Sequence, residues 1–123
     1  MICLDTNYLI LGLVAGSRES RELTTWIASG ERLMVPTLVW FEFLCGPVTA
    51  AQIATMRAFL HELVPFDESH ASTAAALFNA AARKRSTRVD AMIAATAIVA
   101  GVALATNNTD DFRAFQAGGL QLA

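Results

Sequence analysis

The chain opens with Met1-Ile2-Cys3-Leu4-Asp5-Thr6-Asn7, an apolar run that leads directly to a carboxylate flanked by a hydroxyl and an amide. The apolar residues predict a buried strand, and the polar residues mark its end and the start of a helix. Ligands of open α/β sheets collect at the carboxyl ends of the strands, so Asp5 is a candidate site residue. An Asp at this position is also an ordinary helix N-cap, and this stretch alone does not decide between the two.

Strands and helices alternate along the rest of the chain. Short apolar runs predict strands at 32–35, 63–66 and 102–105, and 120–122 is a candidate for a last strand, with helical patterns between them. This alternation predicts an α/β fold, a three-layer α/β/α sandwich around a parallel sheet. The 123 residues suffice for one core and contain no internal repeat or linker. Residues 1–123 are therefore expected to form a single domain.

The composition favours a cytoplasmic protein with a partner. Apolar residues make up 54% of the chain, which favours helices packed on a sheet and hints at a dimer or a protein partner. The apolar stretch 89–105 is too short for a membrane span and contains Asp90 and Gly101. The start of the chain lacks a signal-peptide pattern, and the two cysteines lack metal-ligand spacing. A reduced, cytoplasmic location without a membrane is expected.

Several carboxylates stand where apolar residues are expected. Glu42 is the only charge in the apolar helix predicted at 38–45, and such a helix is mostly buried. Glu42 therefore either reaches solvent through a gap or faces a positive partner. Asp90 begins another apolar helix, where capping of the helix start is the alternative to a site role.

Asp110 and Asp111 follow the strand predicted at 102–105, in a polar loop that also contains Thr106 and Asn108. Capping of the next turn is the alternative for one of these two acids. A parallel sheet brings the ends of its strands to one edge, so these acids are expected near Asp5. Clustered carboxylates repel, and raised pKa values or a bound cation relieve the repulsion. Hard oxygen ligands select Mg²⁺ or Mn²⁺, which suits phosphodiester hydrolysis.

The motifs together resemble a known family. They are Leu4-Asp5-Thr6-Asn7, Glu42 in a helix ending at Cys45-Gly46, Asp90-Ala91-Met92-Ile93-Ala94-Ala95-Thr96-Ala97, and Thr106-Asn107-Asn108-Thr109-Asp110-Asp111-Phe112. In this order they resemble PIN-domain ribonucleases, and within that family the VapC toxins of bacterial toxin-antitoxin pairs. The resemblance covers essentially the whole chain.

The resemblance implies a sheet of four to five parallel strands and a Mg²⁺- or Mn²⁺-dependent endoribonuclease that is the toxin of a type II toxin-antitoxin pair. It also implies an RNA substrate, a homodimer and inhibition by a cognate VapB-like antitoxin. A housekeeping RNA-processing or DNA nuclease of the same fold, or a non-catalytic interaction domain, are the alternatives.

Carried over by position, the resemblance makes Asp5, Glu42 and Asp90 the core metal-binding and catalytic acids, with Asp111 as the fourth. Thr6 is expected to steady Asp5 or a nearby water, and Asn108 is expected to be an accessory polar group. Asp110 is expected to be a solvated loop residue. The candidates for RNA contact are Arg83, Lys84, Arg85, Arg88 and Arg113.

Overall fold

A computed structural model describes residues 1–123, which form one parallel sheet flanked by helices. The strands are β1 (Ile2–Leu4), β2 (Leu33–Pro36), β3 (Glu62–Val64) and β4 (Ala103–Ala105). Their order in the sheet is β3-β2-β1-β4, and each neighbouring pair is parallel. The predicted parallel α/β fold is confirmed, with four strands. The stretch 120–122 forms only an isolated bridge, so it is not a fifth strand.

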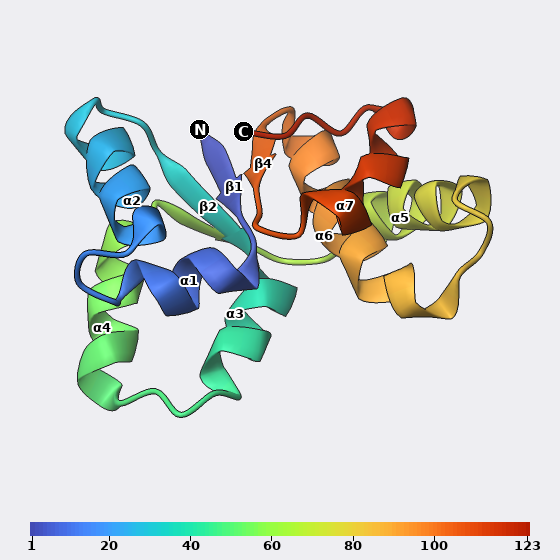
Figure 1. Ribbon diagram of the computed structural model, residues 1–123. Coiled ribbons are helices and arrows are strands. Elements are labelled where there is room, and N and C mark those ends of the chain that lie inside the picture. Colours follow the sequence, from blue (N-terminus) through green and yellow to red (C-terminus); the bar gives the residue numbers. More distant parts are fainter.

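The helices lie on both sides of this sheet (Figure 1). They are α1 (Thr6–Gly12), α2 (Arg18–Ala28), α3 (Thr37–Leu44), α4 (Ala50–Phe59), α5 (Glu68–Ala80), α6 (Arg88–Ala100) and α7 (Thr109–Phe112), with 3-10 turns at Arg85–Thr87 and Arg113–Gly118. Helices α1, α2 and α4 cover one side, and α5, α6 and α7 cover the other, which confirms the three-layer arrangement. None of the helices combines the length and the apolar character that crossing a membrane requires.

Both ends of the chain lie at the amino edge of the sheet, where Figure 1 marks them near each other. The Met1 amino group contacts the Glu31 carboxylate. At the other end, the backbone N–H of Ala123 donates to the carbonyl of Leu104 at 2.9 Å, and Leu122 bridges Leu104 in parallel. The carboxyl ends of the strands point the opposite way, toward α1, α3 and α7.

Side-chain caps start several helices. Thr49 and Gln52 form a capping box at α4, and Asp67 caps α5. The sequence pattern predicts Thr37 as the cap of a helix at 38–45, but Thr37 is the first residue of α3. Pro36, the last residue of β2, occupies the cap position there, and its side chain has no group that could form a capping hydrogen bond.

The basic stretch 83–85 lies beyond α5, although the sequence pattern predicts it in the last helical turn. Helix α5 ends at Ala80, and both Ala82 and Arg83 adopt left-handed backbone with φ of 63° and 57°. Residues in this conformation stop a right-handed helix, so the basic side chains extend from a turn between α5 and α6.

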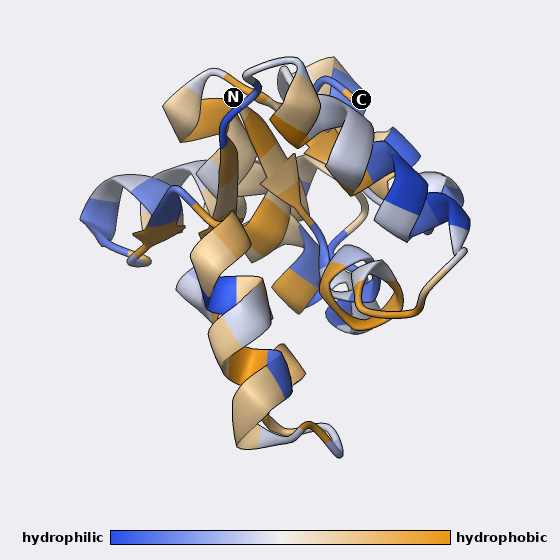
Figure 2. Cartoon of the chain, turned by 90° about the vertical axis from the view of Figure 1, so that its left-hand side faces the viewer, coloured by the Kyte–Doolittle hydropathy of each residue, from blue (hydrophilic) through white to orange (hydrophobic).

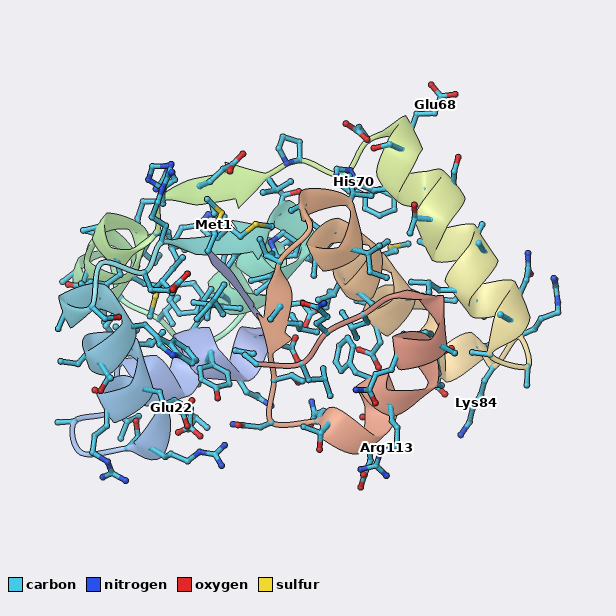
Figure 3. The ribbon with its side chains drawn as sticks, turned by 90° about the horizontal axis from the view of Figure 1, so that it is seen from above. Met1, Glu22, Glu68, His70, Lys84 and Arg113 are labelled. Atoms are coloured by element: carbon cyan, nitrogen blue, oxygen red, sulfur yellow. The ribbon has the colours of Figure 1, made fainter.

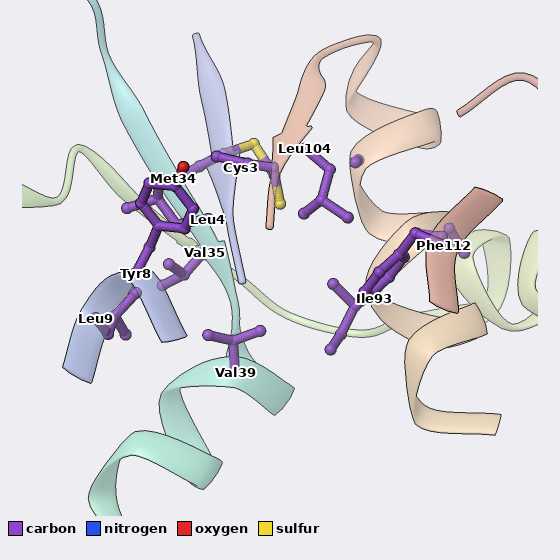
Figure 4. Packing of buried hydrophobic residues seen from close by; sticks show 14 of the residues in the cluster. Cys3, Leu4, Tyr8, Leu9, Met34, Val35, Val39, Ile93, Leu104 and Phe112 are labelled. Carbon is purple, nitrogen blue, oxygen red and sulfur yellow. The ribbon is translucent and has the colours of Figure 1, made fainter. Parts of the chain in front are cut away.

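One apolar core joins the sheet to both helical layers. Figure 2 shows the hydrophobic strands at the centre and the most hydrophilic segments at the periphery. In the core, Cys3 and Leu4 of β1 are fully buried, as is Val35 of β2. On the face of the sheet that α6 and α7 cover, Ile93 of α6 lies against Phe112 of α7 (Figure 4). Phe112 anchors the end of the loop that follows β4.

We expect Phe112→Ala to lower the free energy of unfolding by about 3 to 5 kcal/mol, because it removes a fully buried ring and leaves a cavity. Urea unfolding followed by circular dichroism measures this loss. The matched control is Phe41→Ala, since Phe41 is 65% exposed and its removal should change stability little. Equal losses in the two variants would contradict the packing described for Phe112.

Candidate active site

Four sequence-predicted acids come from four elements that meet at the carboxyl edge of the sheet. Asp5 follows β1, Glu42 lies in α3, Asp90 lies in the first turn of α6, and Asp111 lies in α7 after β4. The strand ends and these helices face the same region in Figure 1. Residues that are far apart in sequence are thus brought to one edge, as expected for a parallel sheet.

Asp5 is both a helix cap and a buried carboxylate of this edge. Its side chain is 5% exposed, and Oδ1 accepts a hydrogen bond from the backbone N–H of Thr6 at 2.8 Å. Oδ2 accepts a hydrogen bond from the Thr106 hydroxyl at 2.8 Å. The capping role accounts for the first oxygen only. The second hydrogen bond comes from the other end of the chain and fixes the orientation of the carboxylate.

Thr106 is a further site residue, and no sequence pattern singles it out. It is 8% exposed, and its hydroxyl also accepts a hydrogen bond from the backbone N–H of Asn108 at 3.0 Å. Leu4 pairs with Ala105 across β1 and β4, so the residues that follow them, Asp5 and Thr106, are neighbours. The place of Thr106 directly after a buried strand is visible in the sequence. Its contact with Asp5 could be predicted only with knowledge of how β1 and β4 are aligned.

Glu42 is exposed to solvent, and the expectation that its helix is mostly buried is wrong. Only Val39 and Phe43 of α3 are buried, while Phe41 is 65% exposed. The partner of Glu42 is a neutral hydroxyl rather than a positive group, since Thr6 Oγ1 donates to Glu42 Oε2 at 3.0 Å. Thr6 therefore contacts two acids, Asp5 through its backbone and Glu42 through its side chain.

Asp90 is an acid whose pKa is shifted by its surroundings. Burial is the largest cause that raises the pKa of Asp90 to about 6, and the nearby charges of Asp5, Asp111 and Glu42 contribute to the same rise. Thr87 occupies the cap position of α6, and no side chain caps that helix. The capping alternative for Asp90 therefore has no support. The carboxylates that act on Asp90 are therefore the three other acids predicted for the site.

The loop after β4 separates the roles of its two acids. Asp110 is exposed and forms an ion pair with Arg113 at 2.9 Å, as expected for a solvated loop residue. Asp111, and not Asp110, contributes to the raised pKa of Asp90. The backbone of Asn108 shapes this loop, because its N–H donates to Thr106 and its carbonyl accepts from the N–H of Asp111 at 3.0 Å.

The chemistry of these donors fits a hard divalent cation, although they do not form a compact ligand group. All are carboxylate oxygens, and none of the four acids takes part in a salt bridge with a Lys, Arg or His. No group of three or more His, Cys, Asp or Glu side chains is close enough to hold a metal ion together. Asp5 is the one acid whose orientation is fixed on both oxygens.

Comparison with known proteins assigns the fold to a family. A family model described as the PIN domain matches residues 2–117. The chain belongs to the PIN-domain family. PIN domains are nucleases, so this chain is a member of a nuclease family. Among curated proteins, none matches the chain.

Solved structures of PIN proteins from toxin-antitoxin systems share this architecture. A chain of a toxin-antitoxin complex from Klebsiella pneumoniae is 28% identical with a TM-score of 0.71, and the match covers 91% of this chain and 90% of that one. A chain of VapBC2 from Rickettsia felis, bound to a promoter DNA fragment, is 18% identical with a TM-score of 0.79, covering 100% and 98%. A chain of FitAcB from Neisseria gonorrhoeae is 22% identical with a TM-score of 0.72, covering 99% and 96%. The expected resemblance to VapC-type PIN proteins is confirmed.

The basic candidates for RNA contact lie between α5 and the start of α6 and directly after α7. Lys84 and Arg113 point outward from the ribbon in Figure 3. Arg83 and Arg88 lie over the ring of Phe78, with 5.6 Å and 5.9 Å from each guanidinium carbon to the ring centroid. These side chains are exposed and contact none of the four acids through a salt bridge.

We expect Thr106→Val to lower the free energy of unfolding by about 1 to 3 kcal/mol, because Asp5 Oδ2 and the Asn108 N–H both lose a buried partner. Thermal and urea unfolding measure the loss. Thr106→Ser keeps the hydroxyl and should restore most of the stability. If the Val and Ser variants were equally stable, the hydrogen bonds of Thr106 would have no energetic role.

We expect Asp90→Asn to stabilise the metal-free PIN domain at pH 7 by about 1 kcal/mol, a value reduced for solvent screening of a half-exposed carboxyl. The folded protein holds the Asp90 proton up to about pH 6, whereas the unfolded chain releases it near its ordinary value of 3.8. The wild type therefore loses stability as the pH rises between these values, and the advantage of Asn disappears near pH 4.

Urea unfolding in the presence of a chelator, repeated across this pH range, measures the effect of Asp90→Asn. The control is Asp110→Asn, which removes an exposed carboxyl already paired with Arg113 and should give no stabilisation. A stability difference for Asp90→Asn that does not change between pH 4 and pH 7 would rule out a raised pKa.

Proposed function

We propose that this PIN domain is a Mg²⁺- or Mn²⁺-dependent endoribonuclease that acts as the toxin of a type II toxin-antitoxin pair. The observation that carries the proposal is the raised pKa of Asp90, caused by burial and by the charges of Asp5, Asp111 and Glu42. Three acids from separate segments disfavour the ionised form of a fourth here, which is unfavourable for the fold and points to a role in function. Sites of this kind bind cations readily, because a positive charge relieves the repulsion.

Asp5, Glu42, Asp90 and Asp111 would hold the cation. A bound Mg²⁺ or Mn²⁺ would lower the pKa of water and neutralise charge that develops on the scissile phosphate. Asp5 supplies a fixed oxygen, since Thr6 and Thr106 orient its carboxylate before anything binds. Asp90 holds a proton on its carboxyl near pH 6 and has to release it to act as a ligand. The exposed Glu42 and Asp111 side chains can rotate toward the fixed acid.

Two observations support a protein partner. The similar chains from K. pneumoniae and R. felis come from toxin-antitoxin complexes, so we propose a VapB-like antitoxin for this chain. Exposed apolar side chains on α1, α2 and α4, namely Ile10, Ile27 and Phe59, offer a surface that a partner would cover. Phe41 on α3 offers another such surface beside Glu42, and a homodimer is our proposal for it.

Asp5→Asn tests the proposal with little change in shape. We expect wild-type protein to arrest growth on brief expression and to cleave cellular RNA in vitro with Mg²⁺ or Mn²⁺. The variant should lose at least about 100-fold of the cleavage rate, because it loses a charge at the one fixed acid. Sequencing of the RNA 5′ ends identifies the cut sites. The matched control is Asp110→Asn, which should behave as wild type.

Equal cleavage and equal growth arrest by the wild type and Asp5→Asn would contradict the assignment of the acids. Cleavage without growth arrest would favour a housekeeping RNA-processing nuclease. Cleavage of DNA in place of RNA would favour a DNA nuclease. Binding of Mn²⁺ by the wild type no tighter than by Glu42→Gln, together with no cleavage, would favour a non-catalytic interaction domain.

A further inference from the structure

We propose that Glu19 and Asn107 form a positioning pair, through which α2 holds the loop between β4 and α7 in place for the acid site. The loop comprises residues 106–108 and leads into α7, which carries Asp111. The inference rests on the proposed function, because it assigns to Glu19 and Asn107 the placement of groups that would hold the cation. Neither residue was selected from the sequence.

The pair is a contact between segments that are 88 residues apart. Asn107 Nδ2 donates a hydrogen bond to Glu19 Oε1 at 3.0 Å. The Arg18 guanidinium contacts Asn107 Oδ1 and also lies 3.4 Å from Glu19 Oε1. The Asn107 amide is therefore held on both of its polar atoms by neighbouring residues of the first turn of α2.

The burial of Glu19 is unusual for a carboxylate at the start of a helix. The helix dipole favours an acid in the first turn, but it favours an exposed acid equally. Glu19 is only 7% exposed, and a buried carboxylate is rarely found without dedicated partners. Hydrogen bonds from its own backbone and from Asn107, with the Arg18 charge, lower the pKa of Glu19, so it is ionised at neutral pH. The helix start alone does not account for a charged group placed inward against a distant loop.

The position of Asn107 in the loop links this contact to the acids. The residue before it, Thr106, donates to Asp5 Oδ2, and the residue after it, Asn108, accepts from the backbone N–H of Asp111. Residues 108–111 are exposed, so core packing fixes this segment only at Phe112. The hydrogen bond to Glu19 supplies a further attachment between the strand end and Phe112. Moving Asn107 would shift Thr106 on one side and Asp111 on the other.

Glu19 and Asn107 act through other residues, so they are positioning residues. Their loss should disturb the orientation of Asp5 and Asp111 while leaving every acid in the chain. Partners of metal ligands typically contribute about 10- to 100-fold to metal affinity, and we expect the lower end of this range here. In the metal-free variants, this loop should also be more mobile than in the wild type.

The experiment uses the full chain and two readouts besides activity. Mn²⁺ affinity is measured by calorimetric titration, and amide hydrogen exchange of residues 105–112 is measured by mass spectrometry on metal-free protein. The variants are Glu19→Ala, Asn107→Ala, the double variant and Glu19→Gln, which keeps an oxygen acceptor for Asn107. The matched control is Glu22→Ala. Glu22 lies in α2, as Glu19 does, and it contacts Tyr8 and Arg18 but no residue of the loop.

We expect each Ala variant to weaken Mn²⁺ binding about 10-fold and to speed exchange in the loop. The double variant should be no worse than either single one, because both remove the same contact. Glu19→Gln and Glu22→Ala should stay close to wild type in both readouts. Should Glu19→Ala not fold, the partly exposed Asn107 still permits the test with Asn107→Ala.

Loop exchange and Mn²⁺ affinity within about twofold of wild type in Asn107→Ala would overturn the positioning role. Equal effects of Glu22→Ala and Glu19→Ala would do the same, since they would indicate a general weakening of α2. Asp5→Asn in the same titration separates this failure from a failure of the proposed function. If Asp5→Asn binds Mn²⁺ as the wild type does, the acids do not hold the cation; if only Asn107→Ala is unaffected, the positioning pair alone is wrong.

Discussion

The pairing of β1 with β4 is the constraint on which the rest of the molecule depends. It joins the first strand of the chain to the last one, and the N–H of Asp5 donates to the carbonyl of Ala105 at 3.0 Å just beyond their final pair. This register makes Asp5 and Thr106 neighbours, and their hydrogen bond fixes the carboxylate at the centre of the site. A register shifted by one residue would turn Thr106 to the opposite face of the sheet and leave the buried Asp5 oxygen without its donor.

Repulsion among the acids at the carboxyl edge of the sheet disfavours folding, and apolar burial in the core offsets this cost. Burial and the like charges of three other acids raise the pKa of Asp90, and none of the four acids has a cationic partner in the chain. The opposing contribution comes from apolar burial on both faces of a short sheet, where fully buried residues of β1, β2, α6 and α7 form one cluster. Phe112 belongs to that cluster and stands next to Asp111, so the same helical turn serves the core and the site.

Much of the fold and part of the site were predictable from sequence, and the failures have physical reasons. Alternating strands and helices placed Asp5 and the 106–111 loop at one edge, and the unexpected charges in apolar helices singled out Glu42 and Asp90. The PIN resemblance then assigned the roles of these acids. Hydrophobicity misled at α3, because it cannot distinguish apolar side chains of the core from exposed ones such as Phe41. Thr106 and the Glu19–Asn107 contact depend on strand register and tertiary packing, which no local pattern encodes. The end of α5 was misplaced because left-handed backbone at Ala82 and Arg83 is not expected from their residue types.

The meeting of both chain ends at the amino edge has a consequence for how this protein can be handled. Leu122 lies beside Leu104, and Leu104 lies beside Cys3, so the last residues are about 10 Å, or two strand spacings, from the first strand. Affinity tags or fluorescent reporters fused at either end would project from the side opposite the acids. A short glycine linker could also join the two ends, and opening the chain between α3 and α4 would then give a permuted protein whose carboxyl edge is unchanged.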